Sequence, residues 1–183
     1  MPRIRPDAEP KRMRVLQSTL LALAEGFFGT RDRSFSIADP RFHERGPFLQ
    51  HSSEDEHLWV ELSNNAAGYW PTAVFELAHE SVHLLNPVKG YTNTLEEGFA
   101  VAFQHFVAPV LSGEAISTTL DSYLEAERLV KELGDDVFHS GKKIRQHFRS
   151  FSKVNVDSLS KLFPSSKPEL LEKLVAECRP RPR

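Results

Sequence analysis

The segment Phe75-Glu76-Leu77-Ala78-His79-Glu80-Ser81-Val82-His83-Leu84-Leu85 carries the clearest pattern in the chain. Its apolar residues recur at helical spacing and predict a helix over residues 73–85. Pro71 suits the first turn of that helix, and Asn86-Pro87 ends it. The same segment contains the pattern His-Glu-x-x-His. Because residues four apart lie on one face of a helix, His79 and His83 can point at a single cation.

These two histidines and Glu80 have the spacing of a hydrolytic metal site. Zinc takes neutral imidazole nitrogens at about 2.0–2.1 Å, needs one more protein ligand, and leaves a position open for water. Glu80 lies beside the pair, where its carboxylate can take a proton from that water. We therefore predict one zinc ion per chain, with His79 and His83 as ligands and Glu80 as general base. Manganese, iron and cobalt also suit such a site.

A second helix, predicted over residues 95–110, offers the third ligand. Its first turn contains Glu96 and Glu97, and the helix dipole favours a carboxylate there with or without a metal. Each glutamate can also form a capping box, Glu96 with Asn93 and Glu97 with Thr94. The residues alone leave both glutamates open, one as the ligand and the other as the cap.

His79-Glu80-Ser81-Val82-His83 followed by Leu95-Glu96-Glu97-Gly98-Phe99-Ala100 resembles the active-site core of the gluzincin metallopeptidases, the thermolysin- and aminopeptidase-like enzymes. The resemblance covers about 30 of the 183 residues. It implies that Glu97, directly before Gly98, completes the zinc site and that the protein hydrolyses peptide bonds. It also implies that an edge strand above the first helix binds extended peptide or protein substrate, and residues 57–62 are the candidate.

Two features depart from the gluzincin pattern. The linker between His83 and Glu97 is short, which suggests a minimal version of the site. Val101 stands where thermolysin-like enzymes place an aspartate that orients a histidine. A carboxylate with that role must therefore come from elsewhere, and Glu76 and Glu96 are the candidates.

A peptidase of this kind also needs an electrophilic group beside the developing oxyanion. Tyr91, in the loop between the two helices, is the first candidate. The next candidates are three histidines, His105, His139 and His147. Other chemistries are disfavoured, because Ser81 lies inside a helix without a Gly-x-Ser-x-Gly turn and no glycine-rich phosphate loop occurs.

The remaining patterns predict a mostly helical fold with a small sheet. Further helices are expected over residues 11–28, 119–133, 137–151, 157–163 and 168–177. Residues 34–37 and 47–50 are weak strand candidates, and 57–62 is a stronger one. We predict an α+β fold, predominantly helical, with the sheet in the N-terminal third packed on the active-site helix and the glutamate-bearing helix. The latter is expected to bury a stripe of Phe99, Phe103, Phe106 and Val110.

Composition and charge bound the domain organisation. Hydrophobic residues make up 40% and charged residues 26%, which is ordinary globular usage. We predict a flexible N-terminus (1–10), a zincin-like catalytic domain (11–135), a basic helical extension packed on it (136–178) and a flexible tail (179–183). The single cysteine, Cys178, fits a reducing compartment. No apolar run approaches the ~18–20 residues of a membrane span, and no signal peptide is recognised. These features predict a cytoplasmic protein with no membrane association.

Charge is distributed unevenly along the chain. Residues 1–140 hold 12 Lys and Arg against 21 Asp and Glu, whereas residues 141–183 hold 11 against 4. This asymmetry fits docking of the basic segment on the acidic body, contact with an anionic or protein partner, or a solvated basic face.

Two functional alternatives to a peptidase remain at this point. One is an intracellular regulatory zincin, of a toxin–antitoxin or stress type, which acts on a protein partner through residues 141–183. The other is a zinc-stabilised binding module without turnover. In such a module, substitution of Glu80 changes nothing, whereas loss of His79 or His83 costs folding stability.

Overall fold

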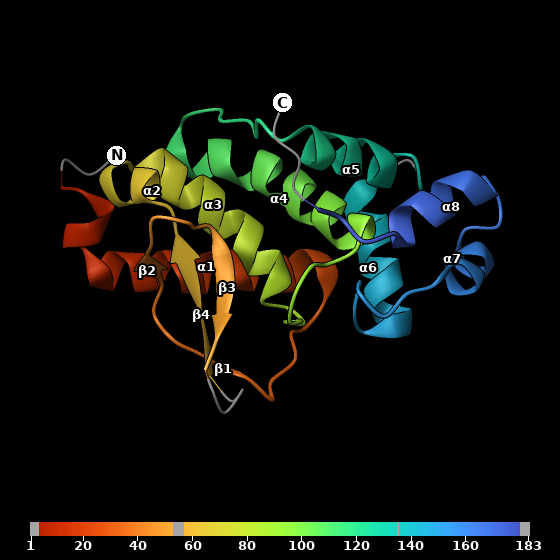
Figure 1. Ribbon diagram of the computed structural model, residues 1–183, viewed down its shortest axis with the longest axis horizontal. Coiled ribbons are helices and arrows are strands. Elements are labelled where there is room, and N and C mark those ends of the chain that lie inside the picture. Colours follow the sequence, from red (N-terminus) through yellow and green to blue (C-terminus); the bar gives the residue numbers. More distant parts are fainter. Residues whose placement is uncertain (1–3, 53–56, 135, 180–183) are drawn as a thin grey trace.

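The computed structural model describes residues 4–52, 57–134 and 136–179 and confirms the predicted helix-rich α+β fold (Figure 1). Within these residues, eight α-helices and a 3-10 turn, η1 (Pro6–Ala8), accompany four short strands. The α-helices are α1 (Pro10–Phe28), α2 (Asn64–Gly68), α3 (Trp70–His83), α4 (Thr94–Ser112), α5 (Asp121–Lys131), α6 (Val137–Phe148), α7 (Val156–Leu162) and α8 (Pro168–Val175).

The sheet is built around a central strand, β4 (His57–Leu62). β3 (Phe48–His51) runs antiparallel along residues 58–61 of β4. β1 (Ser36–Ile37) and β2 (Arg41–Phe42) pair parallel with the two ends of β4, so they share its opposite edge. The prediction that 57–62 is an edge strand was therefore wrong, because both edges of β4 are paired. Among the described residues β3 pairs with β4 alone, so its other edge is open.

α3 is the central helix of the fold. It packs against α4, α1, α2 and β4, and its side chains from Ala73 to His83 are almost all buried. Leu58, Val60 and Leu62 of β4 are fully buried in the core that α3 shares. α3 is buried nearly all round because other elements surround it, and its polar residues His79, Glu80 and His83 are buried with the apolar ones.

α4 differs from its predicted packing in its second half. Phe99 and Phe103 are buried as expected, but Phe106 is 51% exposed and Val110 is 76% exposed. Past Gln104, the buried apolar residues of α4 are Val107 and Ala108. Phe106 contacts Phe27 and Phe138 but stays half-exposed, so the predicted stripe was wrong for Phe106 and Val110 because the neighbouring helices cover a different face there.

The N-terminal residues are held against the body of the protein. The indole N–H of Trp70 donates to the carbonyl of Ile4 at 2.7 Å, and Pro6 is buried. Residues 4–10 of the predicted flexible N-terminus thus contact the body of the protein, while residues 1–3 lie outside the described residues. In the predicted tail 179–183, Arg179 contacts Tyr91 and Glu177, and the rest lies outside them too.

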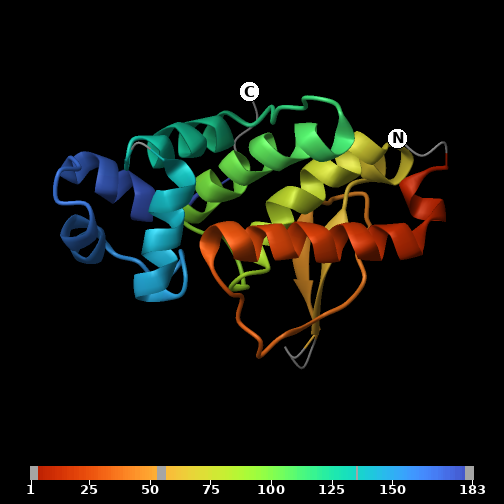
Figure 2. The ribbon, with the colours of Figure 1, turned by 180° about the vertical axis from the view of Figure 1, so that it is seen from behind.

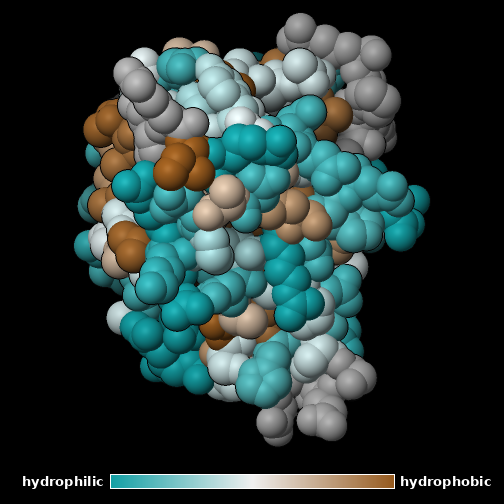
Figure 3. Space-filling view, turned by 90° about the vertical axis from the view of Figure 1, so that its left-hand side faces the viewer, coloured by the Kyte–Doolittle hydropathy of each residue, from teal (hydrophilic) through white to brown (hydrophobic). Residues whose placement is uncertain are grey.

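The basic extension lies against the same body. α8 contacts α4 and α5, and Phe151 lies in the core against Phe28 and Phe99. The end of the molecule that carries η1 is mostly hydrophilic, with hydrophobic residues in small separate groups (Figure 3). Among helices formed by the described residues, none has both the length and the apolar character that a bilayer crossing requires.

Candidate metal centre

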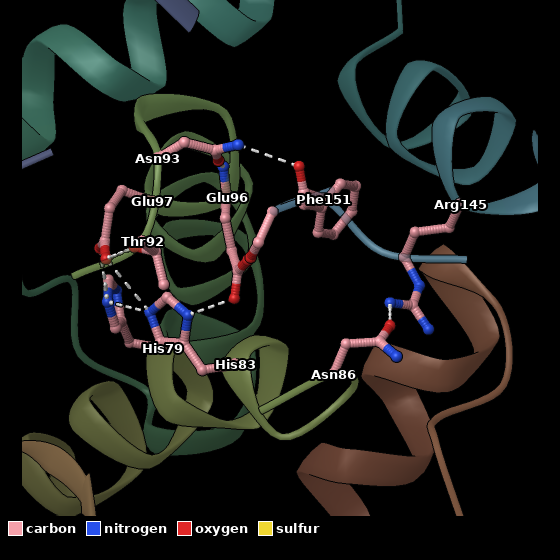
Figure 4. Close-up of polar contacts among 10 residues, drawn as sticks. His79, His83, Asn86, Thr92, Asn93, Glu96, Glu97, Arg145 and Phe151 are labelled. Carbon is pink, nitrogen blue, oxygen red and sulfur yellow. Dashed lines mark hydrogen bonds and ion pairs between the residues drawn. The ribbon is translucent and has the colours of Figure 1, made fainter. Parts of the chain in front are cut away.

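His79 and His83 lie in the last two turns of α3, and Glu97 lies in the first turn of α4 (Figure 4). One ligand atom from each of these three residues lies within 4.8 Å of the other two. The Nε2 atoms of the two histidines are 3.1 Å apart. The Glu97 carboxylate lies 3.2 Å from Nε2 of His79 and 3.6 Å from Nε2 of His83. The three side chains therefore converge from two helices on one point.

Glu96 contacts the opposite nitrogen of His83. Its Oε1 lies 2.9 Å from Nδ1 of His83, and its Oε2 accepts a hydrogen bond from the Ser152 hydroxyl (Figure 4). The α4 N-cap is Asn93, whose side chain accepts from the Glu96 amide at 2.9 Å. Glu96 is thus placed to orient the His83 ring, a role that carboxylates commonly have behind metal-binding imidazoles.

Glu97 and the start of α4 are held by the C-terminal segment. The hydroxyl of Thr92 donates to Oε1 of Glu97. The Cys178 amide in turn donates to the carbonyl of Thr92 at 2.9 Å, and the Thr94 amide donates to that of Ala176 at 2.8 Å. The segment after α8 therefore holds residues 92–94, which lead into the first turn of α4 where both glutamates lie.

The electrostatics of the cluster are those of a buried cation site. Burial alone would raise the pKa of Glu97, but the charge of His83 and hydrogen bonds from both histidines hold it well below its usual value. Burial alone would lower the pKa of His83, but Glu97 and Glu96 hold it well above its usual value. The carboxylate of Glu97 and the charged form of His83 therefore stabilise each other.

The residues fit a metal ion. Two imidazoles and one carboxylate are a donor set that zinc accepts. Among the described residues, the buried Oε2 of Glu97 contacts Nε2 of His79 at 3.2 Å without a hydrogen bond of good geometry, and buried carboxylate oxygens so placed are uncommon. Glu80, 4% exposed, lies beside the two histidines, and burial raises its pKa.

Tyr123, in the first turn of α5, is a site residue that the sequence analysis missed. Its ring stacks on His79, with centroids 5.2 Å apart and planes 13° from parallel. Burial, followed by the nearby charges of Glu97 and Glu80, raises its pKa, so the phenol keeps its proton at neutral pH. Tyr123 belongs to no recognisable motif. Only its place in a helix that packs on α4 could have indicated it.

Gly98 explains how α5 comes so close. A Cβ built at Gly98 would lie 2.4 Å from the carbonyl oxygen of Ala126 and 2.6 Å from Cγ1 of Val130, both on α5. The glycine after Glu97 therefore permits the close contact of α4 with α5 that brings Tyr123 onto His79.

The cluster opens on a cavity of about 610 Å³. The strand β3 and the loop 88–92 line this cavity together with His79, Glu80 and Tyr123. Its volume lies in the range of small-molecule and peptide side-chain sites. Tyr91 lines it too, but it is 60% exposed and its ring lies under the guanidinium of Arg179, 5.4 Å from the ring centroid.

The free edge of β3 borders this cavity. The Ser52 amide donates to His57, and the Leu58 carbonyl accepts from Ala38 on the other side of β4. Because hydrogen-bonding directions alternate along a strand, the backbone groups of Leu49 and His51 point away from β4. They present a short row of donors and acceptors at the mouth of the site.

The remaining candidates lie elsewhere. Nδ1 of His105 pairs with Glu127 at 3.0 Å, while His139 and His147 are exposed on α6, and none of these three histidines lines the cavity. Glu76 accepts hydrogen bonds from the backbone amide and hydroxyl of Ser63. Its carboxylate therefore joins α3 to the start of α2.

Comparisons of the chain with protein-family models, with curated proteins and with solved structures found no match. The resemblance to gluzincins therefore stands on the residues of this chain alone.

Proposed function

We propose that this chain is a zinc-dependent metallopeptidase of the gluzincin type, with His79, His83 and Glu97 as metal ligands. The observation that carries this proposal is the buried convergence of the three side chains beside Glu80, at a cavity bordered by an open strand edge. The placement of Glu96 on Nδ1 of His83 favours Glu97 as the ligand.

Glu80 has the chemical role of general base in this proposal. A bound zinc ion would polarise the scissile carbonyl and lower the pKa of a water molecule. The carboxylate of Glu80 takes the proton from the attacking water and later delivers it to the leaving amine. Burial raises the pKa of Glu80. A raised pKa favours the proton transfer, because it brings the basicity of the carboxylate closer to that of the attacking water and the leaving amine.

Two further parts of the site suit a peptide substrate. Leu49 and His51 on the open edge of β3 can hydrogen-bond an extended peptide as an added strand. The hydroxyl of Tyr123, which keeps its proton, is our candidate donor to the developing oxyanion. We favour Tyr123 over Tyr91 in this proposal because its ring stacks on His79, whereas Tyr91 is largely exposed.

Metal content and hydrolysis, measured together, test the proposal. We expect about one zinc per chain in the wild type and in Glu80→Gln, and little zinc in Glu97→Gln. A peptide-library digest should show cleavage by the wild type and at least about 100-fold less by Glu80→Gln.

Three outcomes would contradict this assignment. Equal cleavage by wild type and Glu80→Gln would exclude the general-base role. Zinc retained by Glu97→Gln but lost by Glu96→Gln would make Glu96 the ligand. Zinc binding with no cleavage of any library peptide would favour a zinc-stabilised binding module.

A further inference from the structure

The end of α1 lies beside α6 (Figure 2). A second cavity, also about 610 Å³, is lined by residues of both helices. Its walls are the end of α1 with the loop 29–33, Asn86 after α3, and residues 145–153 of α6 and the turn that follows. It shares no lining residue with the cavity of the metal centre. The two are therefore separate sites.

Five positively charged side chains line this second cavity: Arg31, Arg33, Arg145, Arg149 and Lys153. One carboxylate, that of Asp32, lines it with them, and Glu25 pairs with Arg33 from outside at 2.8 Å. Three of the cations belong to the basic segment 141–183, and two come from the otherwise acidic first part of the chain. A positive excess concentrated in a concave site attracts anions.

The deepest of these cations has only neutral acceptors. Arg145 is 5% exposed and donates to the carbonyls of Phe28 at 3.2 Å and Thr30 at 2.7 Å, and to the side chain of Asn86 (Figure 4). Burial lowers its pKa to about 10, so the guanidinium stays charged at neutral pH. The free carbonyl groups at the C-terminal end of α1 explain why Arg145 lies there. They do not explain why the other four cations line the same cavity.

Two buried polar atoms of residues that line this cavity have no hydrogen-bond partner among the described residues. They are the hydroxyl of Ser150, a residue that is 2% exposed, and Nε of Arg31, whose Nη1 donates to the carbonyls of Asp32 and Phe35. Buried polar groups without a hydrogen-bond partner are uncommon, because each destabilises the fold until it finds one. A ligand with several oxygen acceptors would supply one.

We propose that this second cavity binds a small organic phosphate. Phosphate oxygens match the forked donors of arginine, and the cavity offers several guanidinium groups with a buried hydroxyl. Its volume exceeds what a lone phosphate ion needs and suits a compact organic molecule. Phe148, which is half-buried, provides an apolar wall for the organic part. This site does not depend on the peptidase assignment.

A nucleic-acid polymer fits the observations less well. The basic segment 141–183 has eight further Lys and Arg residues, and those that the structure describes, Lys161, Lys167 and Lys173 among them, do not line the cavity. A polymer would need its phosphates contacted along an extended track, whereas these cations converge on one concave site.

Titration calorimetry of the full chain with ATP, pyrophosphate, inorganic phosphate and adenosine tests the proposal. Arg149→Asn with Lys153→Gln removes two charges from the cavity, and asparagine tolerates the left-handed conformation of Arg149 (φ 59°). Lys161→Gln with Lys167→Gln removes two charges from the same segment outside the cavity. We expect saturable binding of ATP, weakened at least about tenfold by the cavity variant and less than about twofold by the control variant.

The comparison of variants separates this site from the metal centre, whose residues are the same in all three proteins. Any binding of phosphate oxygens to a metal ion at that centre is therefore the same in all three proteins and drops out when their affinities are compared. Absence of saturable binding by all three phosphate probes would overturn the proposal. So would equal weakening by both variants, which indicates diffuse attraction, or equal affinity for adenosine and ATP. A single-stranded oligonucleotide that binds more tightly than ATP and is weakened equally by both variants would assign the surface to a polymer.

Discussion

The backbone amide of Cys178 donates to the carbonyl of Thr92 at 2.9 Å, which ties the segment after α8 to the residue whose hydroxyl contacts Glu97. The two residues are far apart in sequence, yet this contact and its neighbour between Thr94 and Ala176 hold the start of α4 against the C-terminal segment. The C-terminal extension therefore supports the residues of the candidate metal centre.

Deletion of residues 176–183 should weaken both the fold and metal binding. It removes the two backbone hydrogen bonds to Thr92 and Thr94, which together contribute roughly 1–3 kcal/mol. We expect a lower Tm and a weaker zinc affinity in competition with a chromophoric chelator. Deletion of 180–183 alone is the matched control and should leave both values unchanged. Equal behaviour of the two truncations would show that the contact is dispensable.

Zinc binding should release a proton from His83. In the metal-free protein the carboxylates of Glu97 and Glu96 hold the pKa of His83 well above its usual value, although burial opposes them. Zinc takes the neutral imidazole, so its affinity should rise about tenfold per pH unit below the raised pKa of His83 and level off above that pKa. Calorimetry in buffers of different protonation enthalpy measures the released proton.

The same shift has a consequence for stability without metal. A raised pKa in the folded state stabilises the fold below the usual pKa of histidine, about 6.5, and this contribution is lost as the pH rises through the raised value. Glu96→Gln removes one of the two carboxylates beside His83, so the raised pKa of His83 should fall. The pH at which zinc affinity levels off and the pH at which this contribution to stability is lost should both move downward. Identical pH profiles for wild type and this variant would contradict the role given to Glu96.

Gly98→Ala should destabilise the protein by about 1–3 kcal/mol, because the new methyl group would collide with the α5 backbone at Ala126. The expected relief is a displacement of α5, which also moves Tyr123 from His79. Urea unfolding measures the loss of stability. Gly26→Ala is the control, since a Cβ there has no atom within 4 Å, and it should not destabilise. A stable Gly98→Ala protein would refute the close contact.

The local patterns of the sequence were enough to predict the main helices and the shared face of His79 and His83, because both follow from helical periodicity. They did not distinguish Glu96 from Glu97, since both lie in one turn and their directions depend on how α4 crosses α3. The edge position of β3 and the packing of Ile4 against Trp70 depend on pairing between distant segments. Such pairing leaves no periodic signal in either partner.

Tyr123 shows the same limit within the site, because its role depends on the contact of α5 with α4 and not on any motif. If its hydroxyl stabilises the oxyanion, Tyr123→Phe should lower kcat by about 10²–10³. Its zinc content and KM should change little, because the ring still stacks on His79. Tyr91→Phe, an exposed tyrosine of the same cavity, is the control and should keep nearly full kcat. A large loss in Tyr91→Phe with none in Tyr123→Phe would return the role to Tyr91.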